Sequence, residues 1–306
     1  MASAHADSTN TDRAITGPPA PGVELETIVV EPPEPQFVAP TSRDRIGRIW
    51  APVLIDGKGP YRLVLDTGAS HSAVTERTAR SLGSESAEAP VRVTGFTGTA
   101  LVPTIQVASL EIGDFALGPT RLPVLADVFG GADGVLSLNG MNHQRFFADF
   151  AHDHLEISRS HDERAPAGFD VVPLRMVRGL PAINVRVGGV DAMAIVDTGA
   201  QLSVGNLALR EALAQDTSPA TAQESIVGVT LESQSGDRIP SPAIRLGGLT
   251  IRNMNVVYGD MHLFREWNLT RKPTLIVGMD LLGSFDVVVI DYARREMQVR
   301  PRLAAR

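Results

Sequence analysis

The chain of 306 residues contains no cysteine. This absence excludes disulfide scaffolds, thiolate metal sites, iron–sulfur clusters and thiol nucleophiles. No uninterrupted apolar run approaches the roughly 18 to 20 residues that cross a bilayer, so we expect no membrane span. With 28 basic against 35 acidic residues the net charge is −7, which argues against nucleic acid as a partner. No nucleophile-elbow serine motif, phosphate-binding loop or dinucleotide fingerprint occurs either.

The residues that are present favour a folded protein built from strands. Hydrophobic residues make up 43% of the chain and charged residues 21%, which is enough for one or two ordinary cores. The 28 glycines and 21 prolines supply many turn formers without reaching a low-complexity composition. This composition favours β structure.

Prolines concentrate near the beginning of the chain, where seven of them lie between residues 17 and 40. We therefore expect residues 1–44 to form a Pro-rich flexible leader. Residues 23–30 alternate polar and apolar side chains, which permits either a solvated segment or a docked edge strand. After the leader we expect an N-terminal lobe over residues 45–160 and a C-terminal lobe over residues 161–306.

The two halves of the chain repeat each other at an offset of 131 residues. Residues 63–69 match residues 194–200, and Gly57 falls on Gly188 in a short turn between two apolar runs. Each half therefore begins with a β-hairpin. Downstream, Thr75 falls on Asn206 and each is suited to cap a short helix, over residues 75–82 and 206–213. A duplicated β domain is the simplest account.

Each repeat carries the same short motif after three apolar residues. The motif reads Asp66-Thr67-Gly68-Ala69 in the first half and Asp197-Thr198-Gly199-Ala200 in the second. Splitting an amide with water needs one group to accept a proton from the water and another to protonate the carbonyl oxygen or the leaving nitrogen. Two neighbouring carboxyls that share one proton perform both tasks, because they cannot both ionise cheaply.

With these motifs the sequence resembles the aspartic proteases, specifically the retropepsin-like branch with both motifs fused in one chain. The residues that carry the resemblance are 66–70, 197–200 and the closing 275–278. The resemblance implies an all-β, bilobal acid-protease fold, with two β-barrel-like lobes related by a pseudo-twofold axis and a few short helices. It also implies a water held between the two aspartates and flap hairpins that close over an extended peptide.

The resemblance assigns roles to the motif residues. Asp66 and Asp197 are the expected catalytic pair, Thr67 and Thr198 are expected to cross-link the two loops, and Gly68 and Gly199 leave room for close backbone approach. Ala69 and Ala200 stand where pepsin-like enzymes place a hydroxyl donor, which predicts a raised pKa for the pair and activity at mildly acidic pH. Ser70 completes the first motif, whereas Gln201 stands at its place in the second.

The flaps are expected around Gly95, Phe96, Thr97 and Gly98 in the first half and from Gly228 to Asp237 in the second. Phe96 either covers the substrate or packs as an ordinary core residue. Ser137 stands where the second half has Gly278. The second half also has a longer segment between Val257 and Thr274, which we expect to be a helix packed on the lobe rather than the wall of a substrate pocket.

The His-rich stretch around His152 and His154 permits a metal cluster, but it aligns with the closing hairpin of the second half, so we expect an ordinary polar turn and no metal. No cofactor is expected.

The predicted function is an aspartic endopeptidase acting on a peptide or protein substrate. The alternative is a catalytically weak protein that binds peptides in the same cleft. We expect a monomer, with pairing of two chains as a further alternative. The Ala-rich start before the Pro-rich leader favours a periplasmic or secreted protein, and otherwise a cytoplasmic one.

Overall fold

The computed structural model describes residues 37–40, 42–43, 48–83, 88–113, 115–139, 143–152, 154–161, 164–214 and 219–302. The side chains of residues 37–40, 42–43 and 88 are not among the described features. Within these residues the chain forms three sheets and four short helices. Residues 23–30, for which an edge strand was one expectation, lie outside the described residues.

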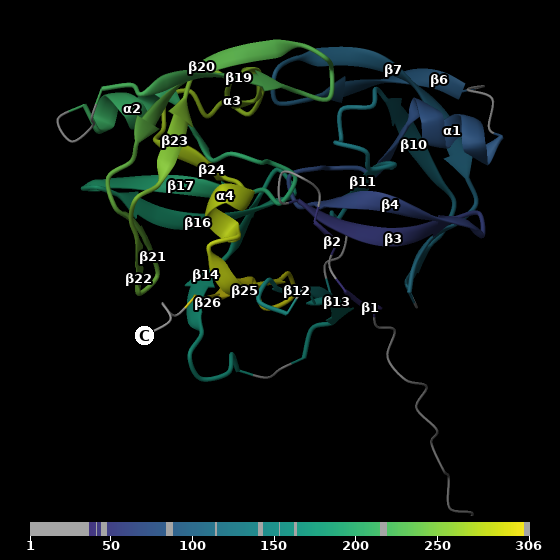
Figure 1. The fold of residues 1–306 in the computed structure, drawn as a ribbon, viewed down its shortest axis with the longest axis horizontal. Helices are drawn as coiled ribbons and strands as arrows, with labels where there is room; N and C mark the ends of the chain where they lie inside the picture. Colours follow the sequence, from purple (N-terminus) through teal and green to yellow (C-terminus); the bar gives the residue numbers. More distant parts are fainter. Residues whose placement is uncertain are drawn as a thin grey trace, which may run out of the picture. The chain divides into compact units, whose positions relative to one another are not determined.

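The first lobe is a ten-stranded sheet built from the first half of the chain (Figure 1). Its main path is β6 (Glu88–Thr94), β7 (Thr99–Val107), β10 (Thr120–Leu125), β5 (Ala73–Thr75), β11 (Gly134–Ser137), β4 (Lys58–Asp66), β3 (Ile49–Ile55), β8 (Leu110–Ile112) and β9 (Phe115–Leu117), and β2 (Ser42–Arg43) pairs with β3. The pairs β4·β11 and β5·β10 are parallel.

The second lobe repeats this order strand for strand. Its path is β19 (Ala222–Val227), β20 (Ser233–Pro240), β23 (Asn255–Tyr258), β18 (Val204–Gly205), β24 (Thr274–Val277), β17 (Val190–Val196), β16 (Leu180–Val187), β21 (Ile244–Leu246) and β22 (Leu249–Ile251), and β15 (Arg175–Val177) pairs with β16. Here β17·β24 and β18·β23 are the parallel pairs. The expected duplicated, bilobal β fold is confirmed, with open sheets in place of closed barrels among the described strands.

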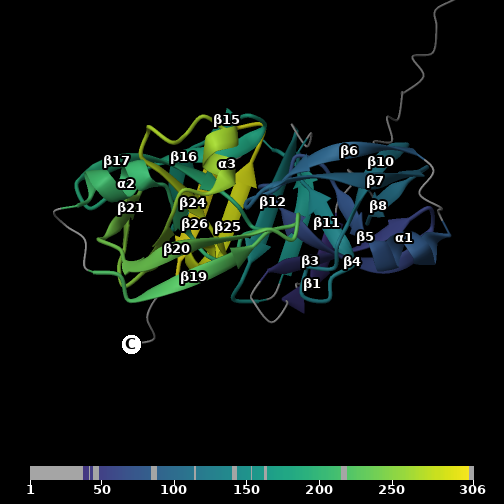
Figure 2. The ribbon, with the colours of Figure 1, turned by 90° about the horizontal axis from the view of Figure 1, so that it is seen from above.

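A third sheet joins the two halves. Its order is β1 (Phe37–Pro40), β13 (His154–Arg159), β12 (Gln144–Asp149), β25 (Phe285–Asp291), β26 (Glu296–Pro301) and β14 (Asp170–Pro173). Each half contributes three neighbouring strands, and the antiparallel pair β12·β25 forms the seam between them. The predicted division at residue 160 lies between β13 and β14. Seen from above, the strands of the two lobes lie side by side (Figure 2).

The four helices are short, and two of them begin where the sequence predicts. Helix α1 (Glu76–Leu82) is capped by the Thr75 side chain and ends at Gly83, whose φ of 74° is left-handed. Helix α2 (Leu207–Ala212) is capped by Asn206. Helices α3 (His262–Glu266) and α4 (Met279–Leu282) belong to the second lobe. Among the described residues, none of these helices has the length and apolarity of a bilayer-crossing segment.

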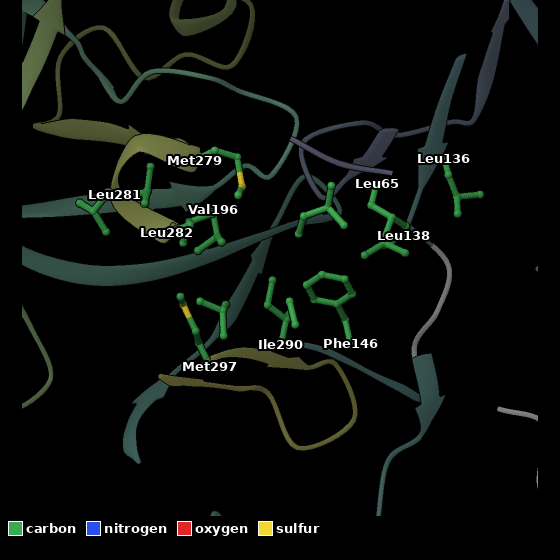
Figure 3. Close-up of a cluster of buried hydrophobic side chains, with 14 of the residues drawn as sticks. Leu65, Leu136, Leu138, Phe146, Val196, Met279, Leu281, Leu282, Ile290 and Met297 are labelled. Atoms are coloured by element: carbon green, nitrogen blue, oxygen red, sulfur yellow. The ribbon is translucent and has the colours of Figure 1, made fainter. Parts of the chain in front are cut away.

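The largest apolar cluster fills the space between the motif strands and the third sheet (Figure 3). Leu65 and Val196 immediately precede the two aspartates, and both are fully buried. They belong to the same cluster as Phe146 on β12 and Ile290 on β25. Burial on both sides therefore fixes the ends of β4 and β17, which carry Asp66 and Asp197.

Two short strands lie within residues 1–44, the range predicted as a leader. Phe37–Pro40 forms β1, which pairs antiparallel with β13, and Ser42–Arg43 forms β2, which pairs with β3. The prolines that suggested a leader do not prevent this arrangement, because β1 is the terminal strand of its sheet and a proline is tolerated there.

The substitution Phe146→Ala tests how much the shared apolar core contributes to the stability of the two halves. Its side chain is 1% exposed, so Phe146→Ala leaves a cavity beneath the motif strands and should lower the free energy of unfolding by about 3–5 kcal/mol. Leu117→Ala, at a position that is 40% exposed, is the control and should change it by less than about 0.5 kcal/mol. Urea unfolding measures both, and equal effects of the two substitutions would contradict this description of the core.

Candidate active site

The two motifs lie at the ends of parallel strand pairs. In the first lobe Leu136 pairs with Leu65 and Ser137 with Asp66. In the second lobe Val277 pairs with Val196, and the Asp197 N–H donates to the Val277 carbonyl at 3.0 Å. Each motif loop therefore begins where a buried strand ends, so the backbone of each aspartate is held by a neighbouring strand.

The two threonines of the motifs exchange hydrogen bonds across the lobes. The Thr67 hydroxyl donates to the Val196 carbonyl at 2.6 Å and accepts from the Thr198 N–H at 3.0 Å. The Thr198 hydroxyl donates to the Leu65 carbonyl at 2.8 Å and accepts from the Thr67 N–H at 3.1 Å. Both side chains are buried. This symmetric set of four bonds joins the loops, as the resemblance implied.

The crossed threonines bring each carboxyl against the other motif. A Cβ atom at Gly68 would lie 2.5 Å from Cγ of Asp197, and one at Gly199 would collide with the Asp66 carboxyl. Only glycine fits at these two positions while the carboxyls stay in place. Each of the two carboxyls also alters the pKa of the other. The structure thus brings together the two carboxyls that the sequence singles out.

Backbone amides donate hydrogen bonds to one oxygen, Oδ1, of each carboxyl. The Gly68 N–H donates to Asp66 Oδ1 at 2.7 Å. Asp197 Oδ1 accepts from the N–H groups of Gly199 at 2.9 Å and Ala200 at 3.0 Å. Such bonds stabilise the ionised form of a carboxyl.

The two carboxyls have different proton affinities. Burial raises the pKa of Asp66 well above its usual range, and the charge of Asp197 raises it further, against the opposing effect of the Gly68 and Ala69 amides. Burial also raises the pKa of Asp197, but the Ala200 and Gly199 amides and the interaction with Asp66 lower it. Because Asp197 Oδ1 accepts two backbone N–H bonds and Asp66 Oδ1 accepts one, the geometry favours Asp197 as the carboxylate of the pair, with the shared proton on Asp66.

The residues next to the motifs differ between the lobes. The Ser70 hydroxyl lies 3.0 Å from Nδ1 of His71, and Gln201 is exposed. Ser137 does stand at the place of Gly278: its hydroxyl donates to the Ala69 carbonyl at 2.7 Å, whereas a Cβ at Gly278 would lie 2.7 Å from the Leu202 carbonyl. A serine fits in the first lobe because its hydroxyl satisfies the carbonyl that it approaches.

Both predicted flaps are hairpins, and Figure 1 shows them on the same side of the structure, reaching toward each other. The turn 95–98 joins β6 to β7, and the turn 228–232 joins β19 to β20. The two tips are in contact. A Cβ at Gly95 would lie 2.8 Å from Cγ2 of Val229, and a Cβ at Gly228 would collide with the Thr97 hydroxyl.

Each flap tip packs against apolar side chains of the opposite lobe. Phe96 joins the second-lobe cluster that contains Ala200 and Phe264. Val229 joins the first-lobe cluster that contains Ala69 and Phe129. Each cluster therefore extends from the residue after a motif glycine to the flap tip of the other half. A Cβ at Gly98 would also collide with the carboxylate of Glu232 in the second tip.

The histidines of the first closing hairpin do not converge on one point. Nδ1 of His152 lies 3.0 Å from Asp149, and the ring of His154 packs edge-on against Phe147. In the part of the chain that the structure describes, no group of three metal-ligating side chains forms a site.

A surface hollow of about 770 Å³ lies on the second lobe, and neither motif aspartate lines it. It is basic, since Arg175, Arg245 and Lys272 contribute to it, while Arg186 pairs with Asp191 at 2.7 Å.

Comparison with protein families agrees with this geometry. The aspartyl protease family model matches residues 51–142 and 183–281, which is one match in each lobe and more than half of the chain. The chain belongs to the aspartyl protease family. The matched regions contain both Asp-Thr-Gly motifs and both flap hairpins. A search of curated proteins found no match to this protease.

The sequence predicts the second flap from Gly228 to Asp237, and the turn of this flap in the protease covers residues 228–232. Val229 and Thr230 follow Gly228 as Phe96 and Thr97 follow Gly95, at an offset of 133. This short repeat, shifted by two residues from the motif repeat, would have located the tip.

Ser203 and Asp280, which were not among the predicted site residues, support the second motif of the protease. The Ser203 hydroxyl donates to Asp280 at 2.6 Å and accepts from the Gly278 N–H at 3.1 Å. The signal for Ser203 was the repeat itself, since Ser203 falls on Ser72 at the offset of 131 and the Ser72 hydroxyl accepts from the Ser137 N–H at 3.0 Å.

Thr67→Val tests the crossed bonds. Valine keeps the shape of threonine but leaves the Thr198 N–H and the Val196 carbonyl buried without their partner, so the free energy of unfolding should fall by about 1–3 kcal/mol. Thr67→Ser retains the hydroxyl and serves as the control. Because Thr198→Val breaks the same network, the double variant should lose less than the sum of the two. Strictly additive losses in denaturant titrations would contradict the network.

The raised pKa of Asp66 predicts a specific pH dependence of stability. Below the pKa of an unfolded aspartate, near 3.9, both states are protonated; as pH rises toward the raised native pKa, the folded state binds more protons and stability falls. Asp66→Asn removes this loss, so its stability advantage over the unaltered protein should grow with pH and then level off. Asp191→Asn should show the opposite trend, because Arg186 lowers the pKa of Asp191. A pH-independent advantage of Asp66→Asn would refute the assignment.

Proposed function

We propose that this protein is an aspartic endopeptidase that hydrolyses peptide bonds through a water activated by Asp66 and Asp197. The observation that carries the proposal is the pair of carboxyls, each of which lies against the glycine of the opposite motif and alters the pKa of the other. Because their environments raise one pKa more than the other, one acid and one base are available together. Membership of the aspartyl protease family supports a peptide substrate.

The chemistry follows from the location of the shared proton. The Asp197 carboxylate accepts a proton from the water while the water oxygen attacks the carbonyl carbon of the substrate. Asp66 donates its proton to the carbonyl oxygen, which gives a neutral tetrahedral diol. In the second step the proton on Asp197 passes to the amide nitrogen, the carbon–nitrogen bond breaks, and Asp66 takes back a proton from the collapsing diol. The pair returns to its starting charge.

The flaps and the apolar clusters support binding of an extended peptide. An extended peptide between the motif loops and the flaps forms main-chain hydrogen bonds as an added strand would. The clusters that contain Ala69 and Ala200 lie on either side of the aspartate pair and favour apolar side chains in the substrate. In the alternative function, a weakly catalytic protein binds peptides at the same place; the presence of both carboxyls favours the enzyme.

A random peptide library tests the proposal. The unaltered protein should cleave library peptides with a maximum at mildly acidic pH, and Asp66→Asn or Asp197→Asn should each lower the rate by about 10²–10⁴-fold, because each removes the acid or the base. Asp191→Asn, a surface carboxyl paired with Arg186, is the matched control and should retain the full rate.

A transition-state mimic with a hydroxyl in place of the scissile carbonyl should inhibit the cleavage. Binding of library peptides without turnover would favour the weakly catalytic alternative, and a maximum near pH 2 would contradict the raised pKa of the pair.

A further inference from the structure

Helix α3 interrupts the duplication of the two lobes. Residues 259–273 connect β23 to β24 in the second lobe, and α3 (His262–Glu266) lies within them. The corresponding connection in the first lobe, residues 126–133 between β10 and β11, is shorter and contains no helix among these described residues. Leu263 and Phe264 of α3 are buried in the second-lobe cluster, which confirms a helix packed on the lobe.

The same helix contacts the tip of the first flap at three points. The Leu263 N–H donates to the Phe96 carbonyl at 3.3 Å, and the rings of Phe96 and Phe264 meet edge to face with centroids 6.4 Å apart. The Thr99 hydroxyl lies 2.9 Å from Nε2 of His262. Main chain, aromatic ring and hydroxyl of the first flap are thus all held by a helix of the opposite lobe.

His262 also contacts the second flap, but farther from its tip. Its backbone N–H donates to Oε1 of Gln234 on β20 at 2.7 Å. Its ring, which is mostly buried, has the Glu266 carboxylate 3.8 Å away in addition to Thr99. His262 therefore contacts both flaps: its backbone N–H bonds to the second flap, and its side chain contacts Thr99 of the first.

The tip of the second flap lacks a comparable anchor. In the described parts of the chain, the backbone hydrogen bonds of residues 228–232 stay within their own hairpin, from Gly228 to Glu232 and from Leu231 to Gly228. The Thr230 hydroxyl is buried without a partner among the described residues, and so is the Thr97 hydroxyl of the first tip, so the hydroxyls do not distinguish the two tips. Leu231 is 63% exposed and has a φ of 65°, an uncommon conformation for a leucine. This tip is held to the first lobe by apolar packing of Val229.

We propose that α3 anchors the first flap and that His262 is a positioning residue for it, so that the two flaps open unequally. The second flap, around Gly228–Glu232, moves to admit a peptide, while the first flap stays docked on α3 and holds its edge of the peptide site in place. Opening the first tip requires loss of the His262–Thr99 bond and of the Phe96–Phe264 contact, whereas opening the second requires neither. The consequence for catalysis rests on the proposed endopeptidase function; the difference in opening does not.

Hydrogen exchange of the full-length protein, followed by mass spectrometry, tests the inequality. After correction for intrinsic rates, peptides that cover residues 94–101 should exchange more slowly than those that cover residues 227–233. Thr99→Val removes the hydroxyl that meets His262 and should speed exchange of the first tip about 2- to 10-fold, which corresponds to one net hydrogen bond. Thr99→Ser should restore the original rate.

Two further variants distinguish loss of the His262–Thr99 bond from a general destabilisation of the flaps. His262→Leu should also speed exchange of the first tip, and the double variant should show less than the combined effect of the two, because both substitutions remove the His262–Thr99 bond; Thr99→Val removes in addition the contact with the Thr94 hydroxyl at 3.2 Å. Thr221→Val makes the same substitution at the base of the second hairpin, where the hydroxyl meets the Arg238 carbonyl, and should leave the first tip unchanged. Equal exchange of the two tips in the unaltered protein, or additive effects of the two substitutions, would overturn the proposal.

Peptide cleavage gives the second readout. Thr99→Val should raise KM severalfold while the pH profile, which belongs to the aspartate pair, stays the same; an unchanged KM would argue against a positioning role for His262. If the unaltered protein cleaves no peptide, the proposed function fails, and the exchange rates of the two tips still decide whether the flaps are unequal.

Discussion

Four hydrogen bonds between the motif loops, all made by Thr67 and Thr198, determine whether this molecule has an active site at all. Each threonine hydroxyl bonds to the main chain of the opposite lobe at both its donor and acceptor positions. Because the aspartates directly precede these threonines, the bonds bring two like charges together that would otherwise separate. The buried strand ends beneath them, with Leu65 and Val196 in one apolar cluster, resist that separation. Proton sharing, and hence a working acid and base, follows from this constraint.

The duplicated fold produces a site that is symmetric at its floor and asymmetric elsewhere. The threonine bonds and the glycines that face the carboxyls are equivalent in the two lobes. The amide bonds are not equivalent in effect, since the pKa of Asp66 is raised well above its usual range whereas opposing hydrogen bonds limit the rise at Asp197. At the flaps the difference is larger, because the described hydrogen bonds of α3 reach the tip of the first flap but, in the second flap, only Gln234, which lies farther from the tip. Hydrolysis itself requires such asymmetry, since the two carboxyls must enter the reaction with different charges.

Local features of the sequence predicted the elements, and the long-range contacts needed the structure. The Asp-Thr-Gly repeat, the helix caps Thr75 and Asn206 and the turn at residues 95–98 depend on neighbouring residues, so their patterns are visible in the sequence. The seam β12·β25 and the pairing of β1 with β13 join strands far apart in the chain, and the alternating patterns of these strands do not specify their partners. The docking of Phe96 on Phe264 was invisible for the same reason, although the long segment that contains α3 was noticed.

The central claim is that Asp66 and Asp197 form one proton-sharing pair. Carbon-13 NMR of aspartate carboxyls, with Asp66→Asn and Asp197→Asn used to assign the two resonances, follows their protonation directly. The account predicts that both resonances respond together over two separated steps, with the last proton leaving at a pH well above that of an ordinary aspartate and mainly from Asp66. Two independent titrations near the ordinary aspartate pKa would show that the carboxyls do not interact, and would contradict the account.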